Sequence, residues 1–113
     1  MTINEWSDAT AMAQAVQNKT VSPRELVEAT IREAERTNPN INAIVSQRYQ
    51  KALEEAETRD FSEKPFAGVP IFLKDLGQEQ AGEPSTAGSR LFTSYRAKET
   101  DNYVKKLEEL GFI

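Results

Sequence analysis

The amino-acid sequence predicts an α/β fold, on the basis of three observations. First, apolar residues recur at helical spacing in four segments, at about residues 8–18, 23–38, 47–59 and 101–110. Second, short runs rich in β-forming residues predict strands at about residues 42–46 and 69–74. Third, the β-forming pair at 112–113 follows the last helix directly, as the next strand does in a strand–helix–strand unit. The predicted architecture is a group of N-terminal helices with the first strands of a sheet that lacks most of its strands.

Two helices begin at residues that are typical of helix N-termini. Ser7 or Asp8 can cap the first helix, and Trp6 is expected to anchor it because a large aromatic side chain buries much apolar area. The residues SPRE at 22–25 have the capping-box form: a hydroxyl at the cap, a proline in the first helical position and a carboxylate three residues after the cap. The Asn-Pro-Asn run at 38–40 is expected to end this second helix, because a residue that precedes proline disfavours the helical conformation.

The second half of the chain differs in character from the first. Residues 66–73 form the longest nearly apolar run, which predicts a buried strand that ends at Lys74. Residues 76–98 show no clear periodicity, so a long loop is expected there, and long loops in compact domains are often functional. Thr100 can cap the last helix, and Gly111 is expected to end it.

The chain is expected to be an N-terminal segment of one larger domain, over residues 1–113. Residues 1–60 are predicted to be helical, and residues 66–113 are predicted to hold a strand, a loop and a helix. A natural domain seldom stops two residues into a strand, so the remainder of the domain is expected to be absent. The unpaired edges of the predicted strands would favour self-association of the chain.

Composition narrows the range of functions. Fourteen Lys and Arg against eighteen Asp and Glu give a net charge of −4 at pH 7, the wrong sign for a protein that neutralises nucleic-acid phosphates. The sequence contains no cysteine and no histidine, which leaves no disulfide, no thiolate zinc site and no Ser–His–Asp triad within it. It has no basic leader and no run of 18 apolar residues. We therefore expect a cytoplasmic protein with no metal, cofactor, nucleic-acid or membrane partner.

Lys74 is the main candidate for a chemical role, because it follows five apolar residues at the end of a predicted strand. A lysine in this position either reaches solvent or is buried with partners, and burial would favour the neutral amine that can act as a base. Strand alternation puts Asp75 on the opposite face, so Asp75 is not expected to pair directly with Lys74. The hydroxyl groups of residues 82–89 could line a pocket, although the same residues are typical of a turn-rich loop.

The residues GVPIFLKD at 68–75 resemble the lysine segment of the amidase signature family. Four further segments agree with this family in the same order along the chain: VSPRELV at 21–27, INAIV at 41–45, AGS at 87–89, and the helix and incipient strand at 101–113. The resemblance covers nearly all of the chain. It implies an amidohydrolase of several hundred residues, built on a mixed sheet surrounded by helices, whose triad is similar to Ser–cisSer–Lys.

The resemblance assigns the role of catalytic base to Lys74 and places both serines of the triad beyond residue 113. Ser85 and Ser89 lie before that segment and are not expected to replace them. The expected reaction converts a small carboxylic amide to an acid and ammonia or an amine, and residues 1–113 alone are expected to be inactive. The substrate is expected to be that of a general amidase or of a cyclic-amide or nylon-oligomer hydrolase.

Two other functions stay open at this point. One is the glutamine-hydrolysing subunit of glutamyl-tRNA amidotransferase, which belongs to the same family and would require protein partners. The other is a stand-alone, non-catalytic interaction module, which a monodisperse monomer with a cooperative melting transition would favour.

Overall fold

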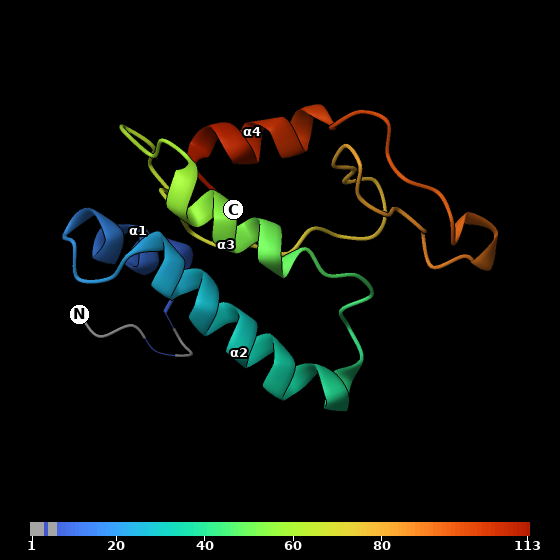
Figure 1. The fold of residues 1–113 in the computed structure, drawn as a ribbon, viewed down its shortest axis with the longest axis horizontal. Helices are drawn as coiled ribbons and strands as arrows, with labels where there is room; N and C mark the ends of the chain where they lie inside the picture. Colours follow the sequence, from blue (N-terminus) through green and yellow to red (C-terminus); the bar gives the residue numbers. More distant parts are fainter. Residues whose placement is uncertain (1–3, 5–6) are drawn as a thin grey trace. The chain divides into compact units, whose positions relative to one another are not determined.

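The computed structural model describes residue 4 and residues 7–113, and Trp6, the predicted anchor of the first helix, lies outside these residues. The described residues form four α-helices and one short 3₁₀-helix, which Figure 1 shows in chain order. Their bounds are α1 Ala9–Gln17, α2 Pro23–Ile41, α3 Tyr49–Thr58, η1 Arg90–Phe92 and α4 Asn102–Leu110. The four predicted helices are therefore confirmed.

The chain divides into two compact units. The first unit comprises the chain up to Ile71 together with Leu110–Ile113, and the second comprises Phe72–Glu109. In the first unit α2 packs against α3, and an ion pair of 2.6 Å between Arg24 Nη1 and Glu57 Oε1 joins the two helices. The buried apolar residues of this unit are small or medium in size: Ala13, Ala15, Leu26, Val27, Ala34, Ala56 and Val69.

The N-terminal caps of α1 and α2 are those that the sequence predicts. The Asp8 carboxylate accepts a hydrogen bond of 2.8 Å from the Ala11 N–H. At α2 the Ser22 hydroxyl accepts from the Glu25 N–H at 3.2 Å, and the Glu25 carboxylate accepts from the Ser22 N–H at 2.7 Å. This reciprocal pair satisfies backbone donors that a helix start otherwise leaves unpaired.

We expect Ser22→Ala to lower the free energy of unfolding by about 1 kcal/mol, because alanine cannot accept the Glu25 N–H. Ser22→Thr keeps a hydroxyl acceptor and should change stability by only a few tenths of a kcal/mol. Urea denaturation of the two variants checks the prediction, and equal stabilities would contradict it.

The predicted end of the second helix is wrong, and so is the strand that was expected after it. The helix α2 continues through Pro39 to Ile41, and Asn42 ends it in the left-handed conformation, with φ of +49°. The Asn38 side-chain oxygen accepts hydrogen bonds of 2.9 Å from the N–H groups of Ala43 and Ile44. These two N–H groups are thus satisfied locally and do not take part in a sheet.

The predicted α/β class is also wrong for the residues that the structure describes, since these contain no β-strand and no sheet. In the expected strand at 69–74, the Val69 carbonyl accepts from the Ile113 N–H at 3.0 Å and the Ile71 N–H donates to the Ile113 carbonyl at 2.9 Å, while the Val69 N–H donates back to the Phe66 carbonyl at 3.2 Å. A ladder needs several successive pairs of this kind. The strand edges from which self-association was predicted are accordingly missing here, and self-association itself stays a prediction.

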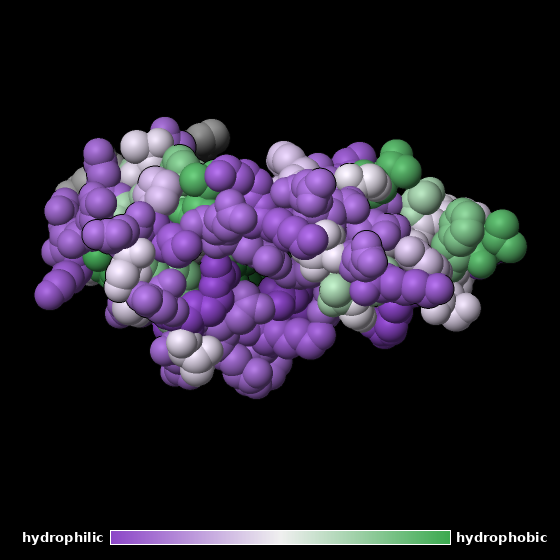
Figure 2. All heavy atoms as spheres, turned by 90° about the horizontal axis from the view of Figure 1, so that it is seen from above, coloured by the Kyte–Doolittle hydropathy of each residue, from purple (hydrophilic) through white to green (hydrophobic). Residues whose placement is uncertain are grey.

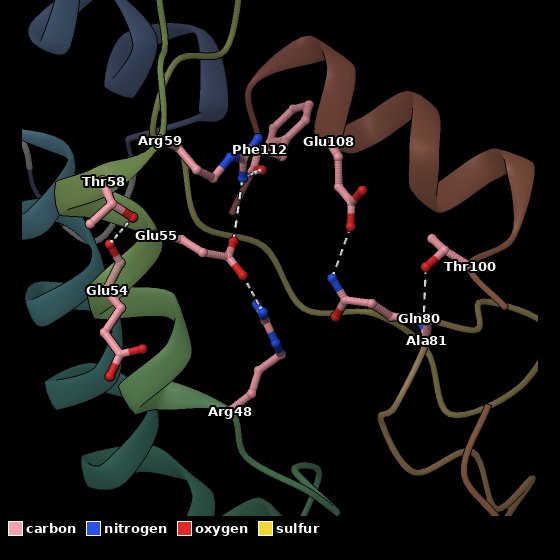
Figure 3. Close-up of polar contacts among 10 residues, drawn as sticks. All are labelled: Arg48, Glu54, Glu55, Thr58, Arg59, Gln80, Ala81, Thr100, Glu108 and Phe112. Atoms are coloured by element: carbon pink, nitrogen blue, oxygen red, sulfur yellow. Dashed lines mark hydrogen bonds and ion pairs between the residues drawn. The ribbon is translucent and has the colours of Figure 1, made fainter. Parts of the chain in front are cut away.

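Polar contacts tie the end of the chain to α3 within the first unit. Figure 3 shows the Glu55 carboxylate between two guanidinium groups, those of Arg48 and Arg59. Arg59 Nη1 also donates to the Phe112 carbonyl at 2.7 Å. The Phe112 ring stacks on Phe66, with ring centroids 4.7 Å apart. Together these contacts hold the C-terminal residues beside the segment that leads to Lys74.

The second unit is mostly an irregular chain anchored to α4. A backbone bridge pairs Pro84 with Arg96 in antiparallel fashion. The side chain of Gln80 donates to Glu108 on α4 at 2.9 Å, and the Ala81 N–H donates to the Thr100 hydroxyl at 3.0 Å (Figure 3). Thr100 was predicted to cap α4, but its hydroxyl accepts this bond from the loop. Gly111 follows the helix with φ of +104°, as the sequence predicts for its end.

The surface of the molecule is mainly hydrophilic on the face that Figure 2 shows, but apolar residues gather at the end of the second unit where η1 lies. Leu91 is 81% exposed and Phe92 is 44% exposed in this 3₁₀-helix. Among the described residues, no helix has both the length and the apolar character that crossing a membrane would require.

Candidate active site

The segment that leads to Lys74 is held in place within the first unit. Gly68 has a positive φ of +72°, and its N–H donates to the Gly111 carbonyl at 2.9 Å. Val69, the next residue, is only 1% exposed. The chain then passes from Ile71 into the second unit and reaches Lys74 three residues later. Burial in this run is confined to Gly68 and Val69, and Phe72 is 56% exposed, so the prediction of a strand that stays buried up to Lys74 is wrong.

Lys74 is exposed, which is the first of the two alternatives that the sequence left open. Its backbone is nevertheless held, because the Lys74 N–H donates to the side-chain oxygen of Gln78 at 2.8 Å. Gln78 lies beyond a tight turn at Gly77, whose φ is +68°. A glycine suits this turn because a side chain at positive φ is strained. The lysine side chain therefore extends into solvent from a backbone that is fixed locally.

The Asp75 carboxylate joins the Lys74 segment to the loop at residues 82–89. Its Oδ1 accepts from the Thr86 N–H at 2.7 Å, and its Oδ2 accepts from the Thr86 hydroxyl. The Asp75 carbonyl accepts a further bond from the Ala87 N–H at 3.0 Å. Hydrogen bonds from the Thr86 hydroxyl, the Thr86 N–H and the Gly88 N–H lower the pKa of Asp75, and the positive charge of Lys74 adds to this effect.

We expect the Asp75–Thr86 contact to survive mild acid. Because the pKa of Asp75 is lowered in the folded state, its carboxylate stabilises that state above the ordinary aspartate pKa of about 3.9, and this contribution is lost as the pH falls through the lower, folded value. Hydrogen exchange of the Thr86 amide measured against pH checks this. Loss of protection above pH 4, or the same profile in Asp75→Asn, would contradict it.

A small open cavity of about 240 Å³ lies on the second unit beside this network. Leu76 and Phe92 provide apolar walls, and Glu79, Ser85 and Tyr95 provide polar atoms. The Tyr95 hydroxyl donates to the Glu79 carboxylate at 3.2 Å. Partial burial, this hydrogen bond and the nearby negative charges raise the pKa of Tyr95. The cavity can therefore present an apolar surface together with one carboxylate.

The loop hydroxyls that were considered as pocket-lining groups have different roles in the structure. Ser85 lines the cavity, as one of the two interpretations of this loop proposed. Thr86 binds Asp75, whereas the Ser89 side chain accepts from the Leu91 N–H at 3.2 Å and caps η1. No group of three His, Cys, Asp or Glu side chains that could hold a metal ion occurs among the residues described.

Sequence reasoning did not find the roles of Gln78 and Thr86. Gln78 has no special pattern around it, and nothing in the sequence indicates that its side chain returns to the Lys74 N–H. For Thr86 a signal was present, because Asp and Thr side chains in turn-rich segments commonly bind nearby backbone groups. The separation of eleven residues between Asp75 and Thr86 concealed this pairing.

The comparisons with known proteins find several relatives that are named as amide hydrolases. A family model described as Amidase matches residues 25–113. The 6-aminohexanoate-cyclic-dimer hydrolase of Pseudomonas sp. (strain NK87) is 36% identical in an alignment 113 residues long that covers 98% of this chain and 22% of that protein. The lipoamidase of Enterococcus faecalis is 38% identical in an alignment 111 residues long that covers 96% of this chain and 15% of that protein.

The same likeness appears in three dimensions. A solved structure of 6-aminohexanoate cyclic dimer hydrolase complexed with substrate matches this chain with a TM-score of 0.89 and 36% sequence identity. The match covers 98% of this chain and 23% of that one. The chain thus spans less than a quarter of the length of each of these relatives.

Proposed function

We propose a function from one premise: this chain belongs to the amidase family. The proposed reaction is the hydrolysis of a carboxylic amide to a carboxylic acid and ammonia or an amine. We assign it to a longer protein in which residues 1–113 are proposed to form the N-terminal segment. Its proposed substrates are small cyclic or linear amides, in keeping with the names of the cyclic-dimer hydrolase and the lipoamidase.

The observation that carries the proposal is the position of Lys74 inside the matched region. The match over residues 25–113 includes the whole segment GVPIFLKD at 68–75, which ends in this lysine and Asp75. The backbone of Lys74 is held through Gln78. A fixed backbone suits a general base, which must lie within hydrogen-bonding reach of the proton that it removes.

In the proposed mechanism, a serine hydroxyl attacks the amide carbonyl carbon and forms an acyl-enzyme. A second serine, on a cis peptide, takes the proton of the first and passes its own proton to the side-chain nitrogen of Lys74. The proton then returns to the leaving nitrogen as the C–N bond breaks, and water hydrolyses the acyl-enzyme. Both serines are proposed to lie beyond residue 113. The Ser89 hydroxyl caps η1, which supports the view that it is not the nucleophile.

The test is an assay of the whole protein with a cyclic amide of 6-aminohexanoate, a linear aliphatic amide, an aryl amide and glutamine. Release of acid and amine from at least one of the first three is the expected result. Ammonia release from glutamine alone would favour the glutaminase subunit of glutamyl-tRNA amidotransferase. Hydrolysis of none of the four would contradict the proposal.

Residues 1–113 by themselves are proposed to be inactive, because the nucleophile and its relay lie outside them. Amide hydrolysis by the purified 113-residue chain that disappears in Lys74→Ala would overturn this part of the proposal. The cytoplasmic location stays a prediction from the sequence.

A further inference from the structure

We propose that Asp75 is a positioning residue that fixes the backbone from which the Lys74 side chain extends. The inference rests on the proposed role of Lys74 as the base. It concerns a side chain that the mechanism above does not use. Asp75 would act by holding the turn at residues 86–88 against the Lys74 segment, without touching the substrate.

The first support is the number of contacts that converge on Asp75. Its two carboxylate oxygens accept from the N–H and the hydroxyl of Thr86, and its carbonyl accepts from the Ala87 N–H at 3.0 Å. The main chain and the side chain of this one residue therefore both bind the same turn. Since Asp75 directly follows Lys74, any displacement of the turn would move the lysine backbone.

The second support is that the turn needs such contacts to keep its shape. Ala87 and Gly88 have φ angles of +49° and +69°, and a residue with a Cβ is strained in this region. The Gly88 N–H donates to the Thr86 hydroxyl at 3.3 Å, so the same hydroxyl that binds Asp75 also closes the turn. Such strained backbone persists only where its surroundings enforce it.

The third support is that Lys74 is held on its other side as well. Its own N–H donates to the Gln78 side chain at 2.8 Å. The lysine backbone is thus fixed through Gln78 and through the Asp75–Thr86 pair. A side chain with four rotatable carbons gains precision from a fixed starting point, and an error of about 1 Å in placing a catalytic group can cost about 10²-fold in rate.

The test compares four single variants of the whole enzyme by kcat, KM and melting temperature. Asp75→Asn leaves one acceptor oxygen in place of two. Thr86→Val removes the hydroxyl and keeps the Thr86 N–H, whereas Thr86→Ser keeps both. Asp60→Asn is the matched control, because the Asp60 carboxylate also accepts from a backbone N–H, that of Ser62 at 2.9 Å, but lies in the first unit.

We expect Asp75→Asn and Thr86→Val each to lower kcat by about 10- to 100-fold, with KM changed by less than about 3-fold. Thr86→Ser and Asp60→Asn should keep kcat within about 2-fold of the original enzyme. The double variant Asp75→Asn/Thr86→Val should lose no more than the more impaired single variant, because both changes break the same contact. If Asp75→Asn does not fold, the inference is tested by comparing kcat between Thr86→Val and Thr86→Ser.

Three results would overturn the inference: a normal kcat in Thr86→Val, equal losses in Thr86→Ser and Thr86→Val, or a raised KM with unchanged kcat. A loss of kcat in Asp60→Asn as large as that in Asp75→Asn would do the same, since it would indicate general destabilisation. Lys74→Ala, assayed in parallel, separates the two proposals. Full activity of Lys74→Ala would contradict the proposal that Lys74 is the base. An inactive Lys74→Ala together with a normal kcat in Thr86→Val would contradict only the role of Asp75.

Discussion

Replacing Lys74 with alanine in the whole protein is expected to lower kcat for amide hydrolysis by at least about 10²- to 10⁴-fold, the usual contribution of a general base. The alanine variant has no amine to accept the proton of the relay serine, so the attacking oxygen keeps its proton and is a poor nucleophile. KM should change little, since the interaction is needed in the transition state and not for binding. Steady-state kinetics with the best substrate of the panel measures both quantities.

The fold of the described residues should tolerate this change, because the Lys74 side chain is exposed among them and the bond from the Lys74 N–H to Gln78 does not involve that side chain. The charge of Lys74 is the smallest of the contributions that lower the pKa of Asp75. The melting temperature of Lys74→Ala should therefore match that of the original protein. Lys98→Ala is the control, because Lys98 is another exposed lysine of the second unit. It should keep normal kcat. Equal rates in the two variants would remove Lys74 from the mechanism.

The helices could be predicted from the sequence because their signals are local. The capping box at Ser22 and Glu25 forms as expected, and so does the cap at Asp8. Each of these contacts spans three residues and needs no distant partner. The predicted end of α2 at residues 38–40 was wrong, because the helix continues to Ile41. Pro39 lies in the last turn of the helix, close to its C-terminal end, where its missing N–H removes one hydrogen bond without ending the helix. The Asn38 side chain accepts from the Ala43 and Ile44 N–H groups that follow the helix.

The strands could not be predicted correctly because a strand depends on a partner that local sequence does not specify. The run at residues 66–73 is apolar and β-forming, yet within the described chain it pairs through its backbone only with Leu110, Gly111 and Ile113. The position of Lys74 at the end of this run was visible in the sequence, and the resemblance supplied its proposed role. The contacts of Asp75 and Gln78 depend on turns at Gly77 and residues 86–88, whose geometry the sequence alone does not determine.

Gly68→Ala is expected to destabilise the protein strongly. A Cβ at this position would lie 2.4 Å from Pro23 Cβ and 2.6 Å from Pro23 Cγ, distances at which atoms overlap. The positive φ of +72° adds strain of about 1–2 kcal/mol. Overpacking of this kind typically costs a further 1–3 kcal/mol or so. The expected loss in the free energy of unfolding is therefore about 2–5 kcal/mol, a large part of the stability of an ordinary domain.

Gly82→Ala separates the two causes. Gly82 has a similar φ of +82°, but a Cβ there would meet no atom within 4 Å. The free energy of unfolding of this variant should fall only by the cost of backbone strain, about 1–2 kcal/mol. Urea denaturation of both variants gives the difference, which we assign to the contact with Pro23. Equal losses at the two glycines would mean that the approach of residue 68 to the start of α2 is not tight.

A double-mutant cycle with Pro23→Gly tests that contact directly. Pro23 occupies the first position of α2, and its ring carbons are the atoms nearest to the added Cβ. In the Pro23→Gly background only the backbone Cα remains close, at 3.1 Å, so Gly68→Ala should cost less there than in the original protein. The coupling energy between the two substitutions should approach the cost of overpacking at residue 68, about 1–3 kcal/mol. Gly68 would then be required because the segment that leads to Lys74 passes against the first turn of α2, where only a residue without a side chain fits.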